Sequence, residues 1–552
     1  METFRFAPPY ELPTYPFVAP PDIGSAERRR YPVVIVGGGL SGLTLACDLA
    51  KRGVASVVLD EDDTVGARGA SSRGICYAQK SLEIFDRLGI FERIVDKGVT
   101  WSVGKTYSGD TEVYSFNLQT ENISNQPPFV NLQQFYIEWY LVDRIGELGN
   151  TELRWKNRVT GIEPHADHVV VTVHTPTGDY KLEADYLIDA TGANSLIRNG
   201  LGLEAHASHS ADRWCITDVR FTKPLPMERW TWVDAPFNEG RGVWQHLMGD
   251  AVWRVDYQMA ADADADVISR PEVAGARLRS QLGPDVDFEF VWIGPYQYRD
   301  HLLDDFRSGR VFFIGDAAHV VSPFGARGGN TGVQDAANLG WKLALVLQGK
   351  ADAALLDTYS AERRRAAVEN LQVTSRTARF LAPRSPAEHT LRRAAVDLAR
   401  RYAFARTLVN TGRMSVANAY PPSASLPDGA RTVQNVALSH SSGRAASVMQ
   451  LLGDGSEVLG IWFEPRQADV DAALRAVEGL PLKLVAVAGA TNLPTLHDPD
   501  GKLARHLGAS SGSVCLVRPD GYLARHLAHP GPAVLASALE TAIGGTLIKE
   551  TA

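Results

Sequence analysis

The chain has few cysteines, and they lie far apart. Only Cys47, Cys76, Cys215 and Cys515 occur among 552 residues, with no CxxC pair and no cluster at metal-ligand spacing. A disulfide framework and a thiolate metal site are therefore excluded as organising features of the fold. Unpaired cysteines are typical of a reducing compartment, so we expect a cytoplasmic protein that binds no metal.

Excess positive charge and long apolar runs are also lacking. The formal net charge is −8 at pH 7, which argues against a nucleic-acid partner because phosphates require a basic surface. No stretch approaches 18 uninterrupted apolar residues, so we expect no membrane span and no membrane partner. Prolines interrupt every short apolar run in residues 1–30, which predicts an extended arm and not a signal peptide.

What is present is the composition of a globular protein with a large core. Hydrophobic residues make up 45% of the chain and charged residues 22%, and the length suits about three or four domains. Strands and helical patterns alternate before residue 205 and after residue 430, whereas residues from about 205 to 300 read as a mostly antiparallel sheet and those from about 351 to 420 as helical. We expect an arm (1–30), a nucleotide-binding unit (31–204 and 300–350), an inserted β-sheet substrate unit (205–299), a helical segment with a linker (351–429) and a separate α/β unit (430–552).

A glycine-rich turn joins a short apolar strand, Val33–Val36, to a helical pattern. Its GxGxxG permits a tight turn, the approach of a diphosphate to the backbone, and close packing of helix and strand. Asp60 ends the next strand, Val57–Leu59, 18 positions after the last glycine, where a carboxylate can bind ribose hydroxyls. The sequence therefore predicts a dinucleotide site made by Gly37, Gly39, Leu40, Ser41, Gly42, Asp60 and Glu61.

A second motif, FFIGDAAHVVSPFGARGGN, covers residues 312–330. Asp316 follows an apolar strand, so its carboxylate lies at the sheet edge where ligands bind in such folds. There it can bond a polyol, which the ribityl chain of FAD has and NAD lacks. Backbone amides at the start of a helix, which we expect over 332–348, can stabilise the negative charge of a reduced flavin. These amides belong to Gly328, Gly329 and Asn330, and together the features favour FAD.

The stretch GDAAHVVSPFGARGGNTGVQDAANLGWKL resembles the second FAD motif of the single-component (class A) flavoprotein aromatic hydroxylases. Within that family it looks like the branch of 3-(3-hydroxyphenyl)propionate and phenol or pentachlorophenol hydroxylases, over about residues 31–365. The resemblance implies an α/β fold: a Rossmann-like FAD-binding domain with an inserted, mainly antiparallel β-sheet substrate domain. It also implies a C-terminal thioredoxin-like α/β domain, here without CxxC because Cys515 is its only cysteine, and a homodimer.

Further cofactor residues follow from this resemblance. SSRGICYAQKSLEIFDRLGI is similar to an Arg-containing family segment, so Arg73 is the expected partner of the FAD ribose or diphosphate. NLQQFYIEWYL makes Gln134 the expected flavin-side donor, although both residues could instead be ordinary surface or helix residues. Val159 falls where a backbone contact to adenine is expected. Pro323 resembles the proline that lies over the flavin near the reacting position.

Two positions depart from the family's pattern. Thr191 in LIDATGANSLIR stands where an acid is usual, whereas Gly192 and Arg198 are kept. In the family this motif is associated with both FAD and the nicotinamide donor, so the departure leaves the contact with the reductant open. Arg327 adds a charge beside the expected flavin edge.

The resemblance also implies the reaction. NADH or NADPH reduces the bound FAD, O2 forms a C4a-hydroperoxyflavin, and an oxygen atom passes to a phenolic or other aromatic ring, with or without a carboxylate. The protein positions the ring and excludes water, while the cofactor supplies the difficult chemistry. Because phenols react better as phenolates, a general base near the hydroxyl would assist.

The stretch GVWQHLMGDAVWRVDYQM (242–259) predicts a hairpin that covers the substrate. Alternate strand residues share a face, which groups Trp244, His246 and Met248 on one strand, and Arg254 and Asp256 on the next. We assign His246 as the base and Arg254 as the anion anchor, with a core or surface role for each as the alternative. Further residues expected to line the substrate pocket are Trp232, Tyr257, Tyr296 and Pro323, with simple packing in the sheet as the alternative for the three aromatic residues.

The choice of substrate, ring position and NADH or NADPH depends on pocket shape, which the fold does not determine. Two other function classes could use the same fold. One is a flavin dehydrogenase or oxidase, which Thr191 favours, and the other is a flavin-binding protein without turnover. Substrate-stimulated NAD(P)H consumption, with product analysis for one incorporated oxygen atom, separates the three.

Overall fold

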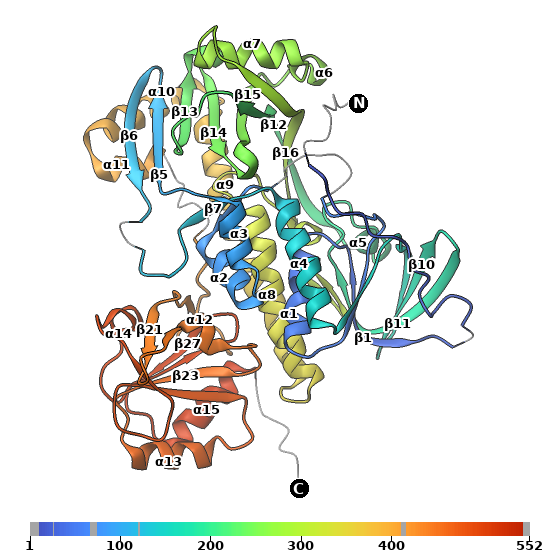
Figure 1. Ribbon diagram of the computed structural model, residues 1–552, viewed down its shortest axis with the longest axis vertical. Coiled ribbons are helices and arrows are strands. Elements are labelled where there is room, and N and C mark those ends of the chain that lie inside the picture. Colours follow the sequence, from blue (N-terminus) through green and yellow to red (C-terminus); the bar gives the residue numbers. More distant parts are fainter. Residues whose placement is uncertain (1–9, 26, 67–73, 120–121, 410–415, 545–552) are drawn as a thin grey trace.

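The computed structural model describes residues 10–25, 27–66, 74–119, 122–409 and 416–544. Figure 1 shows two units built on β-sheets at the top and right, a bundle of helices between them, and a third unit below, coloured orange to red. Within the part of the chain that the structure describes, none of the helices combines the length and apolarity that a membrane crossing needs.

The first sheet has a parallel centre with β1 in the middle. Its path is β17 (Arg307–Ser308), β18 (Val311–Phe313), β11 (Gly178–Asp189), β1 (Arg30–Val36), β2 (Ser56–Leu59) and β8 (Thr151–Arg154), with β10 (Val169–Thr175) and β9 (Arg158–Pro164) added antiparallel beside β11. The contacts from β18 through β8 are all parallel. The apolar runs predicted as strands are therefore strands, and residues after 310 return to this sheet as expected.

Helices cover this sheet, and two of them begin in the two motifs that the sequence assigns to FAD. α1 (Leu40–Lys51) packs between α8 (Gly328–Leu347) and α4 (Gln134–Leu148). α8 begins at Gly328 and not at the expected 332, because tertiary packing overrides the poor helix propensity of two glycines in the first turn. The remaining elements here are α2 (Gln79–Leu88), α3 (Phe91–Lys97), α5 (Leu196–Gly200) and a small sheet of β3 (Cys76–Ala78), β7 (Phe129–Asn131) and β4 (Val99–Thr100).

The second sheet is antiparallel except at one contact. Its path is β19 (His319–Val320), β16 (Phe288–Leu303), β12 (Ala205–Phe221), β15 (Trp253–Met259), β14 (Arg241–Leu247), β13 (Arg229–Ala235), β5 (Val103–Ser108) and β6 (Thr111–Asn117). β14 and β15 form the predicted hairpin, joined by the 3-10 turn Gly249–Ala251. α6 (Ala265–Ile268) and α7 (Pro271–Leu282) lie at this sheet, at the top of Figure 1.

The sheet extends beyond the expected unit 205–299 at both edges. At one edge β19, from residues expected in the nucleotide-binding unit, pairs with β16. β5 and β6 come from within residues 31–204 and add to the edge at β13, where β5 runs parallel to β13. Strand pairing between segments more than a hundred residues apart leaves no local signal in the sequence. A hairpin that was expected to belong to the nucleotide-binding unit therefore completes the second sheet.

Helices and a third sheet make up the rest of the chain. The helical segment contains the 3-10 helix Ala353–Leu356, α9 (Asp357–Leu381), α10 (Pro386–Arg401) and α11 (Ala403–Val409). A further 3-10 helix, Pro236–Asn238, lies between β13 and β14 of the second sheet. The third sheet has the path β20 (Arg431–Thr432), β27 (Tyr522–Leu527), β26 (Val514–Val517), β23 (Val458–Phe463), β24 (Leu482–Val487), β25 (Thr495–His497), β21 (Ala437–His440) and β22 (Ala445–Ser447). Its helices are α12 (Val448–Leu452), α13 (Gln467–Ala476), α14 (Lys502–Leu507) and α15 (Pro532–Ala542).

Candidate flavin site and substrate face

The three glycines of the first motif have different local reasons to be glycine. Gly37 has φ +107°, and a Cβ there would lie 2.5 Å from the carbonyl oxygen of Ala190. A Cβ at Gly42 would collide with the carbonyl oxygen of Gly37. At Gly39, by contrast, the nearest atom to a Cβ is Oε1 of Glu138, 3.9 Å away. Packing requires the first and third glycines, whereas Gly39 faces open space of the kind a diphosphate needs.

The acid of the first motif holds the glycine turn in place. Oδ2 of Asp60 accepts the N–H of Gly38 at 2.5 Å, and Oδ1 accepts the N–H of Asp62 at 2.8 Å. Burial raises the pKa of Asp60, although these hydrogen bonds oppose the rise. Asp60 therefore lies at the carboxyl end of β2, as predicted, with exposed Glu61 beside it.

The two flavin motifs meet through Ser41. Side chains at Gly315 or Gly332 would collide with the Ser41 hydroxyl, so these glycines let the starts of α1 and α8 approach each other. Leu40 is buried, and its Cδ2 would lie 3.3 Å from a Cβ at Gly329. Of the predicted cofactor residues, Leu40 and Gly329 therefore lie close together, and Ser41 lies against the glycines at the turn before α8 and in its first two turns.

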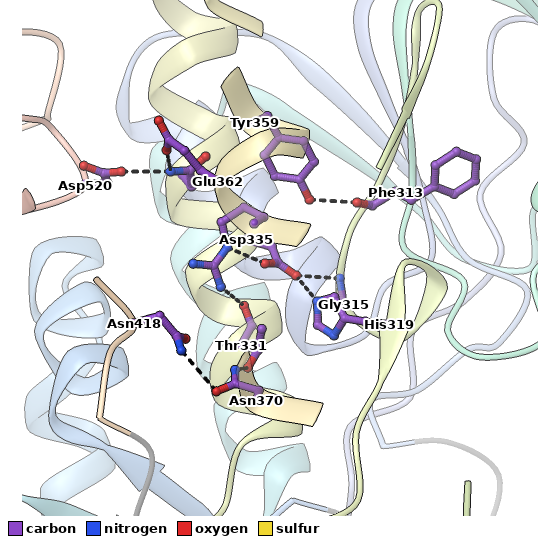
Figure 2. Close-up of polar contacts among 12 residues, drawn as sticks. Phe313, Gly315, His319, Thr331, Asp335, Tyr359, Glu362, Asn370, Asn418 and Asp520 are labelled. Carbon is purple, nitrogen blue, oxygen red and sulfur yellow. Dashed lines mark hydrogen bonds and ion pairs between the residues drawn. The ribbon is translucent and has the colours of Figure 1, made fainter. Parts of the chain in front are cut away.

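Asp316 lies in the 3-10 turn Gly315–Ala317, just beyond β18, with its side chain exposed. Figure 2 shows how the turn is held: Oδ2 of Asp335 accepts the N–H of Gly315 at 3.1 Å and lies 2.6 Å from Nε2 of His319. From the other side, Nη1 of Arg198 donates to the carbonyl oxygen of Ala317 at 3.2 Å. The turn that presents Asp316 is therefore fixed from both sides.

Asp335 belongs to a buried network that extends to the third unit (Figure 2). Its Oδ1 accepts from Nε of Arg363 at 2.6 Å, and Arg363 also donates to the hydroxyl of Tyr420. Burial alone would raise the pKa of Asp335, but His319 and Arg363 outweigh it and the pKa lies below its ordinary value. Glu362, the residue before Arg363 in α9, pairs with Arg518 of the third unit. Sequence reasoning missed this network because its members are scattered from residue 315 to 520.

At the start of α8, the side chain of Asn330 forms hydrogen bonds within the protein. The amide side chain of Asn330 donates to the carbonyl oxygens of Cys76 (2.8 Å) and Ala326 (2.6 Å), and accepts the N–H of Ala78 at 2.9 Å. It therefore anchors β3 to the helix and is fully used within the protein. Of this turn, the backbone amides are the groups that the sequence predicts to face a cofactor.

The residues assigned through the family resemblance lie around these elements. Arg73 lies outside the described residues. Gln134 begins α4, where its Nε2 donates to Glu138 at 2.8 Å and its Oε1 accepts the N–H of Gly74 at 3.2 Å. Val159 is buried in β9. An open hollow of about 590 Å³ lies beyond Asp60 and is lined by Glu61, Asp62, Asp63, Thr64, Lys156, Arg158, His174, Thr175 and Pro176.

The departure at Thr191 has a structural counterpart two residues earlier. The buried carboxylate of Asp189 accepts the hydroxyl of Thr191 at 2.7 Å and its N–H at 3.0 Å, and also accepts the hydroxyl of Ser195. Ser195 in turn caps the N–H of Arg198 at 2.9 Å. An acid is thus present in this turn, and the signal that could have found it is an Asp ending the apolar strand LID.

The β14–β15 hairpin brings the predicted substrate residues to one face. His246 lies opposite Arg254, and Trp244 opposite Asp256, so these four side chains share the face that looks toward the start of α8. Sγ of Cys76, on β3, lies 4.0 Å from Nδ1 of His246. We call Trp244, His246, Arg254 and Asp256 the substrate face. Met248 lies beyond the end of β14 in the core of the first unit and does not join it.

Two of the expected pocket residues lie on the opposite face. Trp232 and Tyr257 are buried in the cluster under α7, where the Tyr257 hydroxyl donates to Oε1 of Gln281 at 2.6 Å. Both residues therefore pack within the sheet and under α7, the alternative that the sequence left open, and not on the face of His246. Tyr296 is 44% exposed and packs edge-on against Tyr298, with the ring centroids 5.2 Å apart.

An aromatic cluster borders the substrate face. Trp244 stacks on Trp214 with the ring centroids 4.3 Å apart, and both meet Phe324 edge-on. Phe324 follows Pro323 in the segment that leads into α8. Pro323, next to Phe324, therefore lies where the second sheet meets the segment before α8.

Residues 30–374 match the FAD binding domain family. The chain belongs to this family. It is 27% identical over 477 residues to a 3-(3-hydroxy-phenyl)propionate/3-hydroxycinnamic acid hydroxylase of Mycolicibacterium smegmatis, spanning 85% of this chain and 84% of that relative. It is 31% identical over 384 residues to an anhydrotetracycline monooxygenase of Streptomyces rimosus, spanning 67% and 73% of the two chains.

Solved structures agree. The OxyS anhydrotetracycline hydroxylase from Streptomyces rimosus superimposes with a TM-score of 0.72 at 28% identity, over 93% of this chain and 99% of its own. The flavin-dependent monooxygenase PieE, solved with FAD and substrate, gives a TM-score of 0.76 over 94% of this chain and 100% of its own, and at 23% identity it supports the fold. The chain is therefore an FAD-dependent monooxygenase, for which NAD(P)H and O2 are the co-substrates.

The described residues fit FAD. In the described part of the chain, a Cβ at Gly39 would meet no atom closer than 3.9 Å, the carboxylate of Asp316 is exposed, and the start of α8 at Gly328 has no side-chain cap. Side-chain clusters of His, Cys, Asp or Glu that could hold a metal ion do not occur among the described residues.

Proposed function

We propose that the chain hydroxylates a phenolic ring, with or without a carboxylate, held between the flavin and the substrate face. The observation that carries the proposal is the combination of buried polar groups at His246, Arg254 and Asp256 with the aromatic cluster around Trp244. A flat ring suits the aromatic surface, and a hydroxyl or carboxylate suits the polar groups.

In this proposal the first motif, Gly37–Gly42, binds the diphosphate, Asp60 and Glu61 bind the ribose, and Asp316 binds the ribityl chain. Backbone amides of Gly328, Gly329 and Asn330 would face the flavin ring, with Gln134 and Val159 as further contacts. When bound, FAD accepts a hydride from NAD(P)H and activates O2 for transfer to the ring. Trp244, Phe324 and Pro323 orient the ring and exclude water around it.

His246 and Arg254 keep substrate roles in modified form. Nε and Nη2 of Arg254 lie 2.9 and 3.1 Å from the two carboxylate oxygens of Asp218, so this guanidinium already has an internal counter-ion. Arg254 would therefore contribute positive potential to the substrate face and would not form a dedicated ion pair with the substrate. His246 would contact the ring hydroxyl as a neutral imidazole, because burial and the nearby Arg229 and Arg254 hold its pKa well below the ordinary value.

We extend the proposal to the architecture. The first sheet binds FAD, the second binds substrate, and the third unit is a thioredoxin-like scaffold. Support for the last point is the central β23, which runs parallel to β24 and antiparallel to β26. A homodimer in the cytoplasm remains a prediction, and the molar mass in solution together with cell fractionation would test it.

The experiment is a substrate panel on the purified flavoprotein. 3-(3-Hydroxyphenyl)propionate and anhydrotetracycline are the first probes, each with NADH and with NADPH. We expect a phenol to stimulate reductant oxidation and to gain one oxygen atom from isotopically labelled O2. Reductant oxidation without oxygen in the product would indicate a dehydrogenase or oxidase, and a flavoprotein that consumes no reductant with any phenol would be a binding protein.

A further inference from the structure

The substrate face contains one acid whose charge is not matched by a hydrogen-bonded partner. Asp256 lies on β15 next to Arg254, whose guanidinium is paired through two contacts with Asp218 of β12. Oδ1 of Asp256 is buried and has no hydrogen-bond partner among the described residues. A buried carboxylate oxygen without a donor is costly, so such a group in a native fold requires an explanation.

The position of Asp256 supplies an explanation for this unpaired carboxylate oxygen. It shares a face with Trp244 and His246, and this face meets flavin-side elements at two points. His246 lies 4.0 Å from Sγ of Cys76, whose carbonyl oxygen is bonded to Asn330 in the first turn of α8. Trp244 meets Phe324, beside Pro323, with the ring centroids 5.3 Å apart. Asp256 therefore lies in the layer between the second sheet and the helix start.

The titratable groups around Asp256 come from five strands. They are Asp218 on β12, Arg229 on β13, His246 on β14 and Arg254 on β15, and the neutral thiol of Cys76 on β3 completes the set. With Asp256 ionised, the two arginines and two aspartates cancel, because His246 is neutral. With Asp256 protonated, the group carries one net positive charge, which suits an anion bound at this face.

We infer that Asp256 is the general base that ionises the ring hydroxyl of the substrate, an inference that rests on the proposed function. The O–H bond of the phenol breaks, its proton forms an O–H bond with the Asp256 carboxylate, and the electron pair remains on the phenolate oxygen. The positive potential of Arg229 and Arg254 stabilises that phenolate. His246 positions the hydroxyl, and the proton returns to solvent after the product leaves.

The electrostatics agree with this assignment. Burial raises the pKa of Asp256 to about 7, a rise that Asp218 reinforces and Arg254 and Arg229 oppose. A base with that pKa is ionised in half or more of the molecules at neutral pH and still has a strong affinity for a proton. Burial and the nearby arginines hold the pKa of His246 well below its ordinary value, so His246 is a weaker base at this face.

The test compares Asp256→Asn with the wild-type flavoprotein across pH 5–9, using the phenol that the substrate panel identifies. We expect flavin reduction to be unchanged within about twofold and the hydroxylation step to fall by about 10²–10⁴-fold, the range typical of a lost general base. In the wild type the hydroxylation rate should fall as the pH drops through about 7, and in the variant this limb should vanish. Asp256→Glu should restore part of the rate, and exposed Asp262→Asn is the matched control.

A second measurement needs no turnover. 4-Nitrophenol absorbs visible light only when ionised, so a difference spectrum reports its protonation state when bound to the flavoprotein. Below the pKa of the free phenol, we expect a phenolate band with wild type and none with Asp256→Asn. If the variant kept both the band and the acid limb, the inference would be overturned, as it would be if His246→Gln alone removed them. A wild type that ionises 4-nitrophenol but hydroxylates nothing would contradict the proposed function and leave the base in place.

Discussion

Nε2 of His319 lies 2.6 Å from Oδ2 of Asp335, and the same oxygen accepts the backbone N–H of Gly315 at 3.1 Å. Both side chains are fully buried. The contact links α8 to the turn that presents Asp316, and Arg363 holds the other oxygen of Asp335. The conformation of the turn that presents Asp316 is thus held by a buried charge network.

Asp335→Asn tests this link. Removing one charge from a buried ion-pair network leaves the others uncompensated and typically costs about 3–5 kcal/mol of the free energy of unfolding. We expect a lower melting temperature and weaker FAD retention, measured by flavin release on dilution. Asp357→Asn, which removes an exposed ion pair with Arg307, is the control and should change both by little. Equal behaviour of the two variants would contradict the role of the network.

The glycine turn gives a pair of variants with opposite expectations. A methyl group at Gly39 meets no protein atom closer than 3.9 Å, so Gly39→Ala should leave the melting of the apoprotein unchanged while weakening FAD binding about tenfold or more. Gly42→Ala places the same group against the carbonyl oxygen of Gly37 and should destabilise the apoprotein itself. Calorimetry of the apoproteins and flavin titration check the two effects separately. A Gly39→Ala protein with normal FAD affinity would remove this residue from the diphosphate site.

Asp256 also makes a prediction about stability. Its pKa is about 7 in the fold and 3.8 in the unfolded chain, so between these values the folded state binds one proton more. Stability from this group is therefore present at low pH and lost as the pH rises from about 4 to 7. Asp256→Asn should be more stable than wild type above pH 7, by on the order of 2–4 kcal/mol, with the difference shrinking toward pH 4. Urea unfolding at pH 4.5 and 8 measures this, and a difference independent of pH would contradict the raised pKa.

The third unit docks through a buried charge cluster. The Arg518 guanidinium pairs with Glu362 of α9 at 2.8 Å and with Asp520 at 2.6 Å, and all three side chains are buried. We expect Arg518→Met to lower the free energy of unfolding by about 3 kcal/mol, because two carboxylates lose their shared partner. Arg466→Met, which breaks an exposed pair with Asp469, should cost less than about 1 kcal/mol. Limited proteolysis should cut near residues 416–430 only in the first variant; resistance equal to wild type would argue against docking by this cluster.

The parts of the site that the sequence predicted are those with local signals. The glycine turn, the helix after it and the acid at position 60 occupy one continuous βαβ stretch, in which each element is determined by residues nearby. The hairpin at 242–259 was also local, and it correctly paired Arg254 with Asp256 on one face. Sequence reasoning was sufficient where neighbours in the chain are neighbours in space.

The parts that it missed depend on distant pairing. Asp218, 36 residues earlier on another strand, neutralises Arg254. Arg254 is therefore a weaker candidate for binding a substrate anion, and Asp256 becomes the candidate base. Trp232 and Tyr257 could line the pocket or pack in the sheet as far as the sequence shows, and contacts with α7 decide for packing. β5 and β6 joined the second sheet across more than a hundred residues, and Asp189 supplied an acid that was sought at position 191. In each case the deciding contact comes from another element of the fold.

The most direct test of the account is the flavin content of the purified protein. The account predicts a yellow protein that releases one FAD per chain on denaturation, identified by mass, and whose apoprotein takes up FAD to the same stoichiometry. A folded protein that purifies without FAD and does not take it up when it is supplied would contradict it.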